Sequence, residues 1–215
     1  MSWERKDLVV LTADDDIRHA LDGILTQKDR LGIRTISYDV FTHPNHDPGC
    51  LRESATFLRA HIKQYERALV VFDREGCGRD GKSRKALEQD VETSLASNGW
   101  ADRAAGIAID PELEIWVFSN APHVEDLLGF RGAPQDLRCW LVGENWLVEG
   151  RVKPQRPKEA LQAALRFRRK PRSASIYRRL GALVPLERCT DAAFVKLRDV
   201  LRRWFAHDAT SGHEG

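Results

Sequence analysis

Cysteine and long hydrophobic runs are both scarce in this sequence, and their scarcity excludes several classes of protein. Its 215 residues include four cysteines, which are far apart and form no Cys-x-x-Cys pair: Cys50, Cys77, Cys139 and Cys189. This spacing argues against a structural zinc site or a disulfide framework and favours a cytoplasmic protein. The apolar runs are too short to span a bilayer, and the first residues contain no apolar signal region. We therefore expect no membrane attachment.

Charged residues, in contrast, are abundant, at 31% of the chain, beside 42% hydrophobic residues. This composition is typical of a globular protein with one domain, or one domain and an appendage. The net charge is only +2 and does not by itself indicate nucleic-acid binding. The basic residues, however, crowd into one C-terminal stretch: Arg166, Arg168, Arg169, Lys170, Arg172, Arg178 and Arg179. Such a cluster either neutralises phosphates or forms a solvated helix face.

Short apolar runs alternate with amphipathic stretches through about residue 120. The pattern predicts strands over 8–11, 33–41, 68–73 and 104–109. It predicts helices over 14–26, 51–65 and 83–97, and a further helix that starts at Pro111, with a turn-rich loop over 42–49. This alternation is the signature of an α/β fold, here a parallel sheet of about four strands with flanking helices.

Beyond residue 120 the strand signals stop. Helices are predicted over 123–128, 157–167, 173–183 and 190–205, and residues 131–156 are predicted to be irregular. The chain is therefore divided into an α/β domain, residues 1–120, and a mainly helical C-terminal extension, residues 121–215.

Two carboxylates follow the most apolar of the predicted strands. Asp73 and Glu75 come after the run 68–72, and Gly76 and Gly78 follow them. In open α/β sheets ligands bind beyond the carboxyl ends of the strands, and residues two apart in an extended chain share a face. Mg²⁺ or Mn²⁺ needs few protein carboxylates, so Asp73 and Glu75 are the predicted metal ligands. The competing interpretation is a surface turn with solvated acids.

Further acids follow two other predicted strands. Asp14 opens the helix after the first strand, and Glu114 lies one turn into the helix after the fourth. With Asp73 and Glu75 they are candidate catalytic residues, as ligands or as proton-transfer groups. The alternative for both is an ordinary first-turn acid that stabilises the helix dipole. His43, His46 and Asp47, in the predicted loop, are better suited to substrate contact than to metal binding.

The loop after Asp73 also supports a competing function. Residues 76–83, Gly-Cys-Gly-Arg-Asp-Gly-Lys-Ser, match the pattern GxxxxGK[ST] of a P-loop, which cradles nucleotide phosphates between a strand and a helix. Two features count against this interpretation: three residues separate the strand from the loop, and the motif follows the third strand rather than the first.

The first 120 residues resemble the Toprim-like families of bacterial anti-phage defence loci. These share a fold with the nuclease part of overcoming-lysogenization-defect proteins and with topoisomerase and primase cores. Asp73-x-Glu75 resembles the family's acidic pair after the third strand, and Pro111-Glu-Leu-Glu-Ile-Trp116 resembles a segment of defence-linked members. The family's Glu-Gly after the first strand is absent, because Thr12 and Ala13 stand there.

The resemblance implies a magnesium-dependent nuclease within a defence system. Asp73 and Glu75 would hold Mg²⁺ or Mn²⁺, with phosphates bound by candidates that share positive charge: Arg74, Arg79, Lys82, Arg168, Arg169, Lys170 and Arg172. The missing glutamate, with the tryptophans Trp116, Trp140 and Trp146, keeps a second hypothesis open, a non-catalytic subunit of a multi-protein defence complex.

Overall fold

Four parallel strands form one sheet at the centre of the protein. The computed structural model describes residues 4–79, 81–118, 122–183 and 189–207. The strands are β1 (Lys6–Thr12), β2 (Tyr38–Thr42), β3 (Tyr65–Asp73) and β4 (Ala104–Ile109), in the order β2-β1-β3-β4. The central strands β1 and β3 are almost continuously buried, as expected when helices cover both faces of a sheet. The predicted α/β fold is therefore confirmed.

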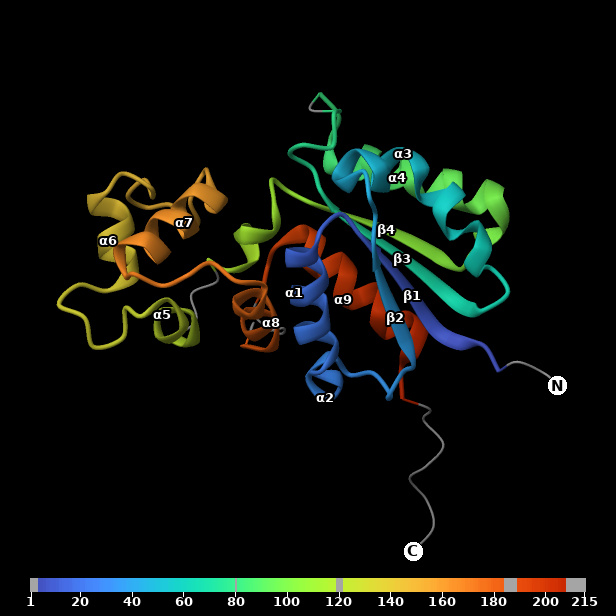
Figure 1. Cartoon of the computed structure of the whole chain (residues 1–215), viewed down its shortest axis with the longest axis horizontal. Helices are drawn as coiled ribbons and strands as arrows, with labels where there is room; N and C mark the ends of the chain where they lie inside the picture. Colours follow the sequence, from blue (N-terminus) through green and yellow to red (C-terminus); the bar gives the residue numbers. More distant parts are fainter. Residues whose placement is uncertain (1–3, 80, 119–121, 184–188, 208–215) are drawn as a thin grey trace, which may run out of the picture.

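Helices pack on both faces of this sheet (Figure 1). Helices α3 (His46–Leu58) and α4 (Arg84–Leu95) cover one face, and α1 (Asp15–Leu25) and α9 (Ala192–Phe205) cover the other. Helix α8 (Ala174–Leu183) packs beside α1, and the short α2 (Lys28–Leu31) contacts α9. Thus α8 and α9, from the C-terminal part of the chain, pack on the α/β layers, while the division at residue 120 stays a prediction.

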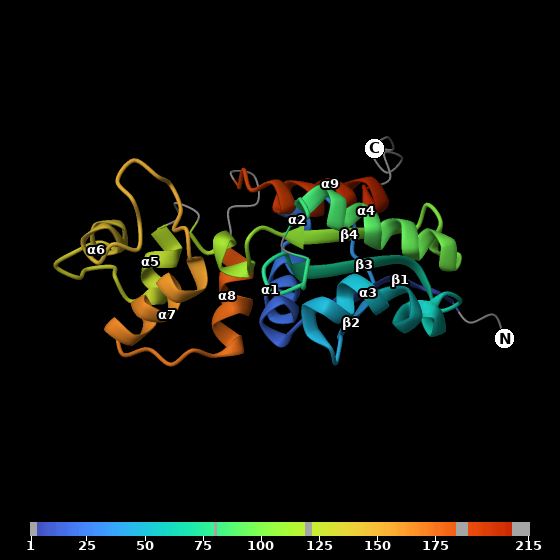
Figure 2. The ribbon, with the colours of Figure 1, turned by 90° about the horizontal axis from the view of Figure 1, so that it is seen from above.

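Three further helices lie together to one side, near the carboxyl ends of the strands (Figures 1 and 2). They are α5 (Pro122–Leu128), α6 (Leu137–Gly143) and α7 (Pro157–Phe167). We call residues 122–172 the helical lobe. Its helix α7 contacts the single 3-10 turn that follows β4, η3 (Leu113–Trp116). The lobe therefore adjoins the sheet edge where the sequence predicts the site.

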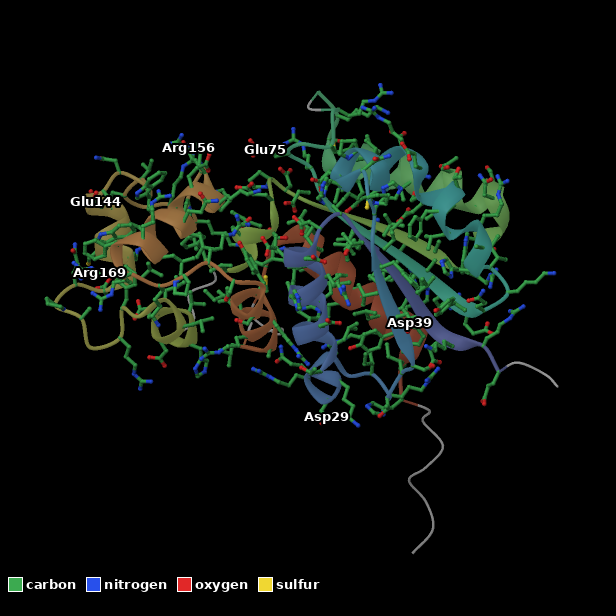
Figure 3. All side chains as sticks on the ribbon, in the orientation of Figure 1. Asp29, Asp39, Glu75, Glu144, Arg156 and Arg169 are labelled. Carbon is green, nitrogen blue, oxygen red and sulfur yellow. The ribbon has the colours of Figure 1, made fainter. Side chains whose placement is uncertain are left out.

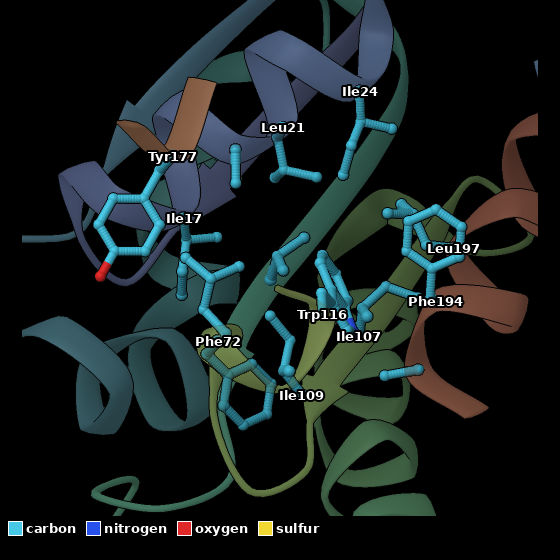
Figure 4. Packing of buried hydrophobic residues seen from close by; sticks show 14 of the residues in the cluster. Ile17, Leu21, Ile24, Phe72, Ile107, Ile109, Trp116, Tyr177, Phe194 and Leu197 are labelled. Carbon is cyan, nitrogen blue, oxygen red and sulfur yellow. The ribbon is translucent and has the colours of Figure 1, made fainter. Parts of the chain in front are cut away.

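One hydrophobic core joins the sheet to the helices on its α1 face (Figure 4). Trp116 of η3 meets Phe194 of α9 edge to face, with ring centroids 5.3 Å apart. The indole N–H of Trp116 donates to Asp191, 2.9 Å away, and Asp191 also caps the start of α9. These contacts fix the chain after β4 against the C-terminal helix.

Helices α1 and α8 approach so closely that glycine is required on both. A Cβ atom at Gly23 would lie 2.1 Å from the carbonyl oxygen of Arg178, and one at Gly181 would lie 2.1 Å from that of Ala20. Both distances are far shorter than a van der Waals contact. The atoms met belong to the backbone, so they cannot move away by a side-chain rotation. The two glycines therefore set the position of α8 on the domain.

The outer edge of β4 is closed by side chains. Glu92 accepts the backbone N–H of Gly106 at 3.1 Å, and Glu88 accepts that of Ala108 at 3.2 Å. Lys196 of α9 donates to both carboxylates, at 2.7 Å to Glu92 and 3.2 Å to Glu88. The buried charge of Glu88 is thereby paired, and the outward N–H groups of Gly106 and Ala108 are satisfied.

Several predicted boundaries differ from the structure. Strand β2 begins at Tyr38, not at residue 33, because Ile33 instead bridges to Ala206 at the end of α9. Helix α3 begins inside the predicted loop 42–49. Pro48 and Gly49, which predict a turn, lie in the first helical turn, where proline costs no hydrogen bond.

Two more differences concern the chain after β4. The predicted helix at Pro111 is only the 3-10 turn η3, because the backbone around Pro111 pairs with the loop after β3. The predicted irregular region 131–156 contains α6, which Asp136 caps by accepting the N–H of Cys139 at 2.7 Å.

Candidate metal centre

Three buried carboxylates meet at the carboxyl ends of β3 and β4. Asp73 is the last residue of β3, and Glu112 and Glu114 follow β4. One oxygen from each lies within 4.8 Å of the others, and all three residues are buried. We call Asp73, Glu112 and Glu114 the acidic triad.

Strand pairing explains why these residues meet. Asp73 lies beside Ile109 in the register of β3 and β4. Beyond the strands, the N–H of Arg74 donates to Ile109 at 2.7 Å, and that of Glu75 donates to Pro111 at 3.0 Å. This pairing holds the chain after β4 against the end of β3, and so brings Glu112 and Glu114 to Asp73.

Asp73 carries the strongest sign of a ligand-binding role. It is 6% exposed, and its Oδ1 atom has no hydrogen-bond partner among the residues that the structure describes. Its backbone N–H donates to Asp47 at 2.7 Å, which places a further carboxylate beside it. Burial, and then the neighbouring carboxylates, raise the pKa of Asp73 well above its usual value. A bound cation would offset both the burial of the charge of Asp73 and its repulsion by the neighbouring carboxylates.

The other two triad members are held from the C-terminal part of the chain. The hydroxyl of Tyr177, on α8, donates to Glu114 at 2.6 Å. The backbone N–H of Lys158, at the start of α7, donates to Glu112 at 2.8 Å. Burial raises the pKa of Glu112, and the negative charge of Glu114 adds to that effect.

Two cations lie at the limit of ion-pair distance from the triad. Lys158 Nζ is 3.9 Å from Glu112, and an Arg172 guanidinium nitrogen is 4.0 Å from Glu114. Arg172 also hydrogen-bonds Asp16. Burial lowers the pKa of Lys158, but the triad carboxylates outweigh it and leave that pKa raised. The two cations reduce the negative charge without taking the place of a ligand on Asp73.

A second set of acids surrounds the triad. Burial raises the pKa of Asp47 and that of Asp16, and Asp14 adds its charge to both effects. Asp14 is half-buried and accepts the N–H of Ile17 at 2.8 Å, as the N-cap of α1. The predicted catalytic Asp14 is thus near the site but outside the triad, and it caps α1, just before the first helical turn where the alternative interpretation places it.

The predicted pair Asp73 and Glu75 is divided by the structure. Asp73 and the predicted Glu114 belong to the triad, whereas the side chain of Glu75 is exposed (Figure 3). Glu75 remains near enough to Glu112 for its charge to contribute to the raised pKa of that residue. The third triad member, Glu112, is not predicted from the sequence.

The predicted phosphate-binding residues in the loop after β3 differ in their surroundings. Arg74 donates to Asp110 at 3.1 Å and to the carbonyl of Lys82 at 3.2 Å. Lys82 pairs with Asp90, and Arg79 is exposed. Residues 76–83 do connect a strand to a helix, and Ser83 caps α4, but Asp80 lies outside the described residues. The P-loop interpretation stays a prediction.

The basic residues predicted near the end of α7 are also divided. Arg169 is exposed and Arg168 lies over the ring of Phe130, 5.5 Å from its centroid. Lys170 donates to the carbonyl of Leu127 at 2.8 Å. Arg172 belongs to the acidic site, so these four residues extend from the triad to the surface of the lobe.

Thr12 stands where the resemblance noted in the sequence leads us to expect a glutamate. It is fully buried, and its hydroxyl lies 3.2 Å from the carbonyl oxygens of Asp14 and Phe41. The carboxyl end of β1 therefore provides no acid at this position, and acids come instead from α1, α3, β3 and the chain after β4.

Chemically, three carboxylate oxygens in a buried site match the hard oxygen ligands that Mg²⁺ and Mn²⁺ prefer. No helix within the described ranges is long and apolar enough to cross a membrane. Comparison with known proteins finds no matching family model, no significantly similar curated protein and no significantly similar solved structure.

Proposed function

We propose that this protein is a Mg²⁺- or Mn²⁺-dependent phosphodiesterase that cleaves nucleic acid, with the metal held by Asp73, Glu112 and Glu114. The observation that carries the proposal is the unpartnered, buried Oδ1 of Asp73 within the acidic triad. A buried carboxylate oxygen without a partner is costly, and a divalent cation is the ligand that satisfies Asp73 while it also binds the other two carboxylates of the triad.

A bound metal would supply charge neutralisation at the scissile phosphate and a coordinated water of lowered pKa. Lys158 and Arg172, beside the triad, supply positive charge for non-bridging phosphate oxygens. Glu75 is exposed beside Glu112 and is the group placed to accept a proton from water that enters from solvent. Tyr177 holds Glu114 in place through its hydrogen bond.

We further propose that this activity serves bacterial anti-phage defence. This part of the proposal is supported by the sequence resemblance, which lies in Asp73-x-Glu75 and the segment 111–116. In the structure these two segments are the ones that meet at the acidic triad.

Metal binding and cleavage of plasmid and single-stranded DNA test the proposal together. D73N, E112Q and E114Q should each lose Mn²⁺ binding in calorimetry and lose metal-dependent cleavage. E159Q is the matched control, because Glu159 is an exposed acid next to Lys158 on α7. E75Q should retain metal binding and lose activity. Metal-dependent cleavage that survives in D73N would refute the assignment.

A non-catalytic subunit of a defence complex is the second candidate. The buried Thr12, which leaves β1 without the expected acid, favours it. The tryptophans do not, because Trp116 and Trp140 are buried in this chain's own core and Trp146 lies half-buried against Arg156. Mn²⁺ binding without cleavage, with a protein partner that co-purifies, would favour the subunit over the enzyme.

A further inference from the structure

The helical lobe exposes an aromatic ring at the end of α7. The large hydrophobic side chains that are exposed in the described part of the chain all belong to this lobe: Val148, Val152 and Phe167. Phe167 is 55% exposed and is the one aromatic residue among them. An exposed phenylalanine alone is ordinary, so its surroundings decide what it can do.

Phe167 is the exposed member of a group of stacked rings. Its ring stacks on Trp140, with centroids 5.1 Å apart and planes at 29°, and on Phe130, at 6.1 Å and 23°. Trp140 and Phe130 are both buried. The packing holds Phe167 in one orientation, so a further flat ring can stack on it with little loss of side-chain freedom.

Basic residues flank Phe167 in the sequence. Arg166 and Arg169 are exposed on either side of it in the sequence, and Arg168 lies over Phe130. Figure 3 places Arg169 on the outer part of the lobe. Residues 122–172 contain eleven Lys and Arg against six Asp and Glu, whereas the rest of the chain has more acids than bases. The lobe thus carries the excess positive charge of the protein.

Helix α7 connects this surface to the acidic triad. Lys158, in its first turn, contacts Glu112, and Phe167 is its last residue. At 1.5 Å per residue the two positions are about 14 Å apart along the helix. A nucleic-acid strand that leaves the triad along α7 would reach Phe167 within a few nucleotides.

We propose that the end of α7 binds single-stranded nucleic acid, with a base stacked on Phe167 and phosphates on Arg166 and Arg169. The inference rests on the proposed function for its substrate and deepens it by naming the single-stranded form. Stacking requires an unpaired base, since a duplex does not expose the faces of its bases. Cations beside an exposed ring are the combination that single-strand binding surfaces use.

The test is the affinity for fluorescein-labelled oligonucleotides of about 20 nucleotides, measured by anisotropy in EDTA so that no cleavage occurs. Three ligands are compared: oligothymidylate, oligouridylate and a DNA duplex. In F167L, which keeps an apolar contact with Trp140, we expect about tenfold weaker binding of the single strands. Duplex affinity should change less than twofold, and F167W should bind as the wild type does.

Two controls separate stacking from general effects. V148A and V152A remove exposed apolar groups from the same lobe and should leave every affinity unchanged. R166Q/R169Q should weaken the binding of all three ligands and reduce its salt dependence. Thermal unfolding of each variant confirms that it is folded.

Cys139 offers a second measurement. It is exposed, next to Trp140 in α6, and the other cysteines are buried. The fluorescence of a label on Cys139 should change when oligothymidylate binds the wild type. The same titration of F167L should give an affinity that is about tenfold weaker.

Unchanged single-strand affinity in F167L, an equal loss for the duplex, or no nucleic-acid binding by the wild type would each overturn the inference. Its failure is distinct from failure of the proposed function. Unchanged binding in F167L with cleavage intact removes only the stacking site, whereas normal binding with no metal-dependent cleavage removes only the enzyme.

Discussion

Substitution of Gly181 by alanine tests whether the contact between α1 and α8 positions the site. The added Cβ would lie 2.1 Å from the carbonyl oxygen of Ala20, so the helices must separate by about 1.3 Å to reach ordinary contact at 3.4 Å. A gap of about 1 Å already forfeits up to about half of the dispersion energy of the atoms that face it. Overpacking of this kind costs about 1–3 kcal/mol, and a backbone clash belongs at the upper end.

Alanine also favours a helix over glycine by about 1 kcal/mol, which offsets part of this cost. We therefore expect G181A to lower the free energy of unfolding by about 2 kcal/mol, which lowers the Tm by about 4–8 °C in a chain of this size. Calorimetry and urea unfolding measure both. G143A is the control, because Gly143 also lies in the last turn of a helix but its Cβ would meet only a side-chain nitrogen of Gln135 at 3.8 Å.

Gly23 makes the same contact from the other helix, where its Cβ would meet Arg178 at 2.1 Å. Once one substitution has separated the helices, the second should cost little, so G23A/G181A should be destabilised by less than the sum of the single variants. Tyr177 moves with α8, and Mn²⁺ affinity should fall in G181A. A Tm for G181A equal to or above that of the wild type would show that the contact between α1 and α8 tolerates a methyl group and does not position α8.

Two further predictions concern single hydroxyl groups. Y177F removes the 2.6 Å hydrogen bond to Glu114 and should weaken Mn²⁺ binding about 10- to 100-fold while the fold is kept; calorimetry that shows unchanged affinity would contradict a positioning role. Burial and the hydrogen bond to Asp39 raise the pKa of Tyr65 to about 12 from 10. The unfolded chain therefore loses this proton first, so the stabilisation is complete below pH 10 and is lost as the pH rises through about 12. Urea unfolding across this range should show that loss in the wild type and a smaller one in Y65F.

The sequence predicts the sheet well because its central strands are continuous apolar runs. The predicted range of β4 matches the structure at both ends. The predicted range of α7, which has a strong helical period, does so too. The errors fall where local signals compete with tertiary contacts. Pro48 and Gly49 have the character of turn residues, yet they fit the first turn of α3, where Gly49 leaves room for the ring of His43.

The site is only partly visible in the sequence. Asp73 ends β3 and Glu114 follows β4, and both are predicted. The prediction puts Glu75 in the metal site because side chains alternate along a strand, but the turn after β3 does not continue that alternation. Glu112 precedes Glu114 by two residues, just as Asp73 precedes Glu75, and both glutamates lie in the segment after β4. The sequence therefore contains a signal for Glu112. Lys158 and Tyr177 have none, since only the folding of α7 and α8 against the sheet brings them to the triad.

The closed edge of β4 has a consequence for assembly. Unpaired strand edges invite pairing with another chain, and Glu88, Glu92 and Lys196 occupy that edge here. A partner strand that extends this sheet must therefore join β2, the strand at the opposite edge. The acidic triad lies at the ends of β3 and β4, away from β2. An oligomer that extends the sheet at β2 would therefore leave the triad as open to substrate as it is in a single copy.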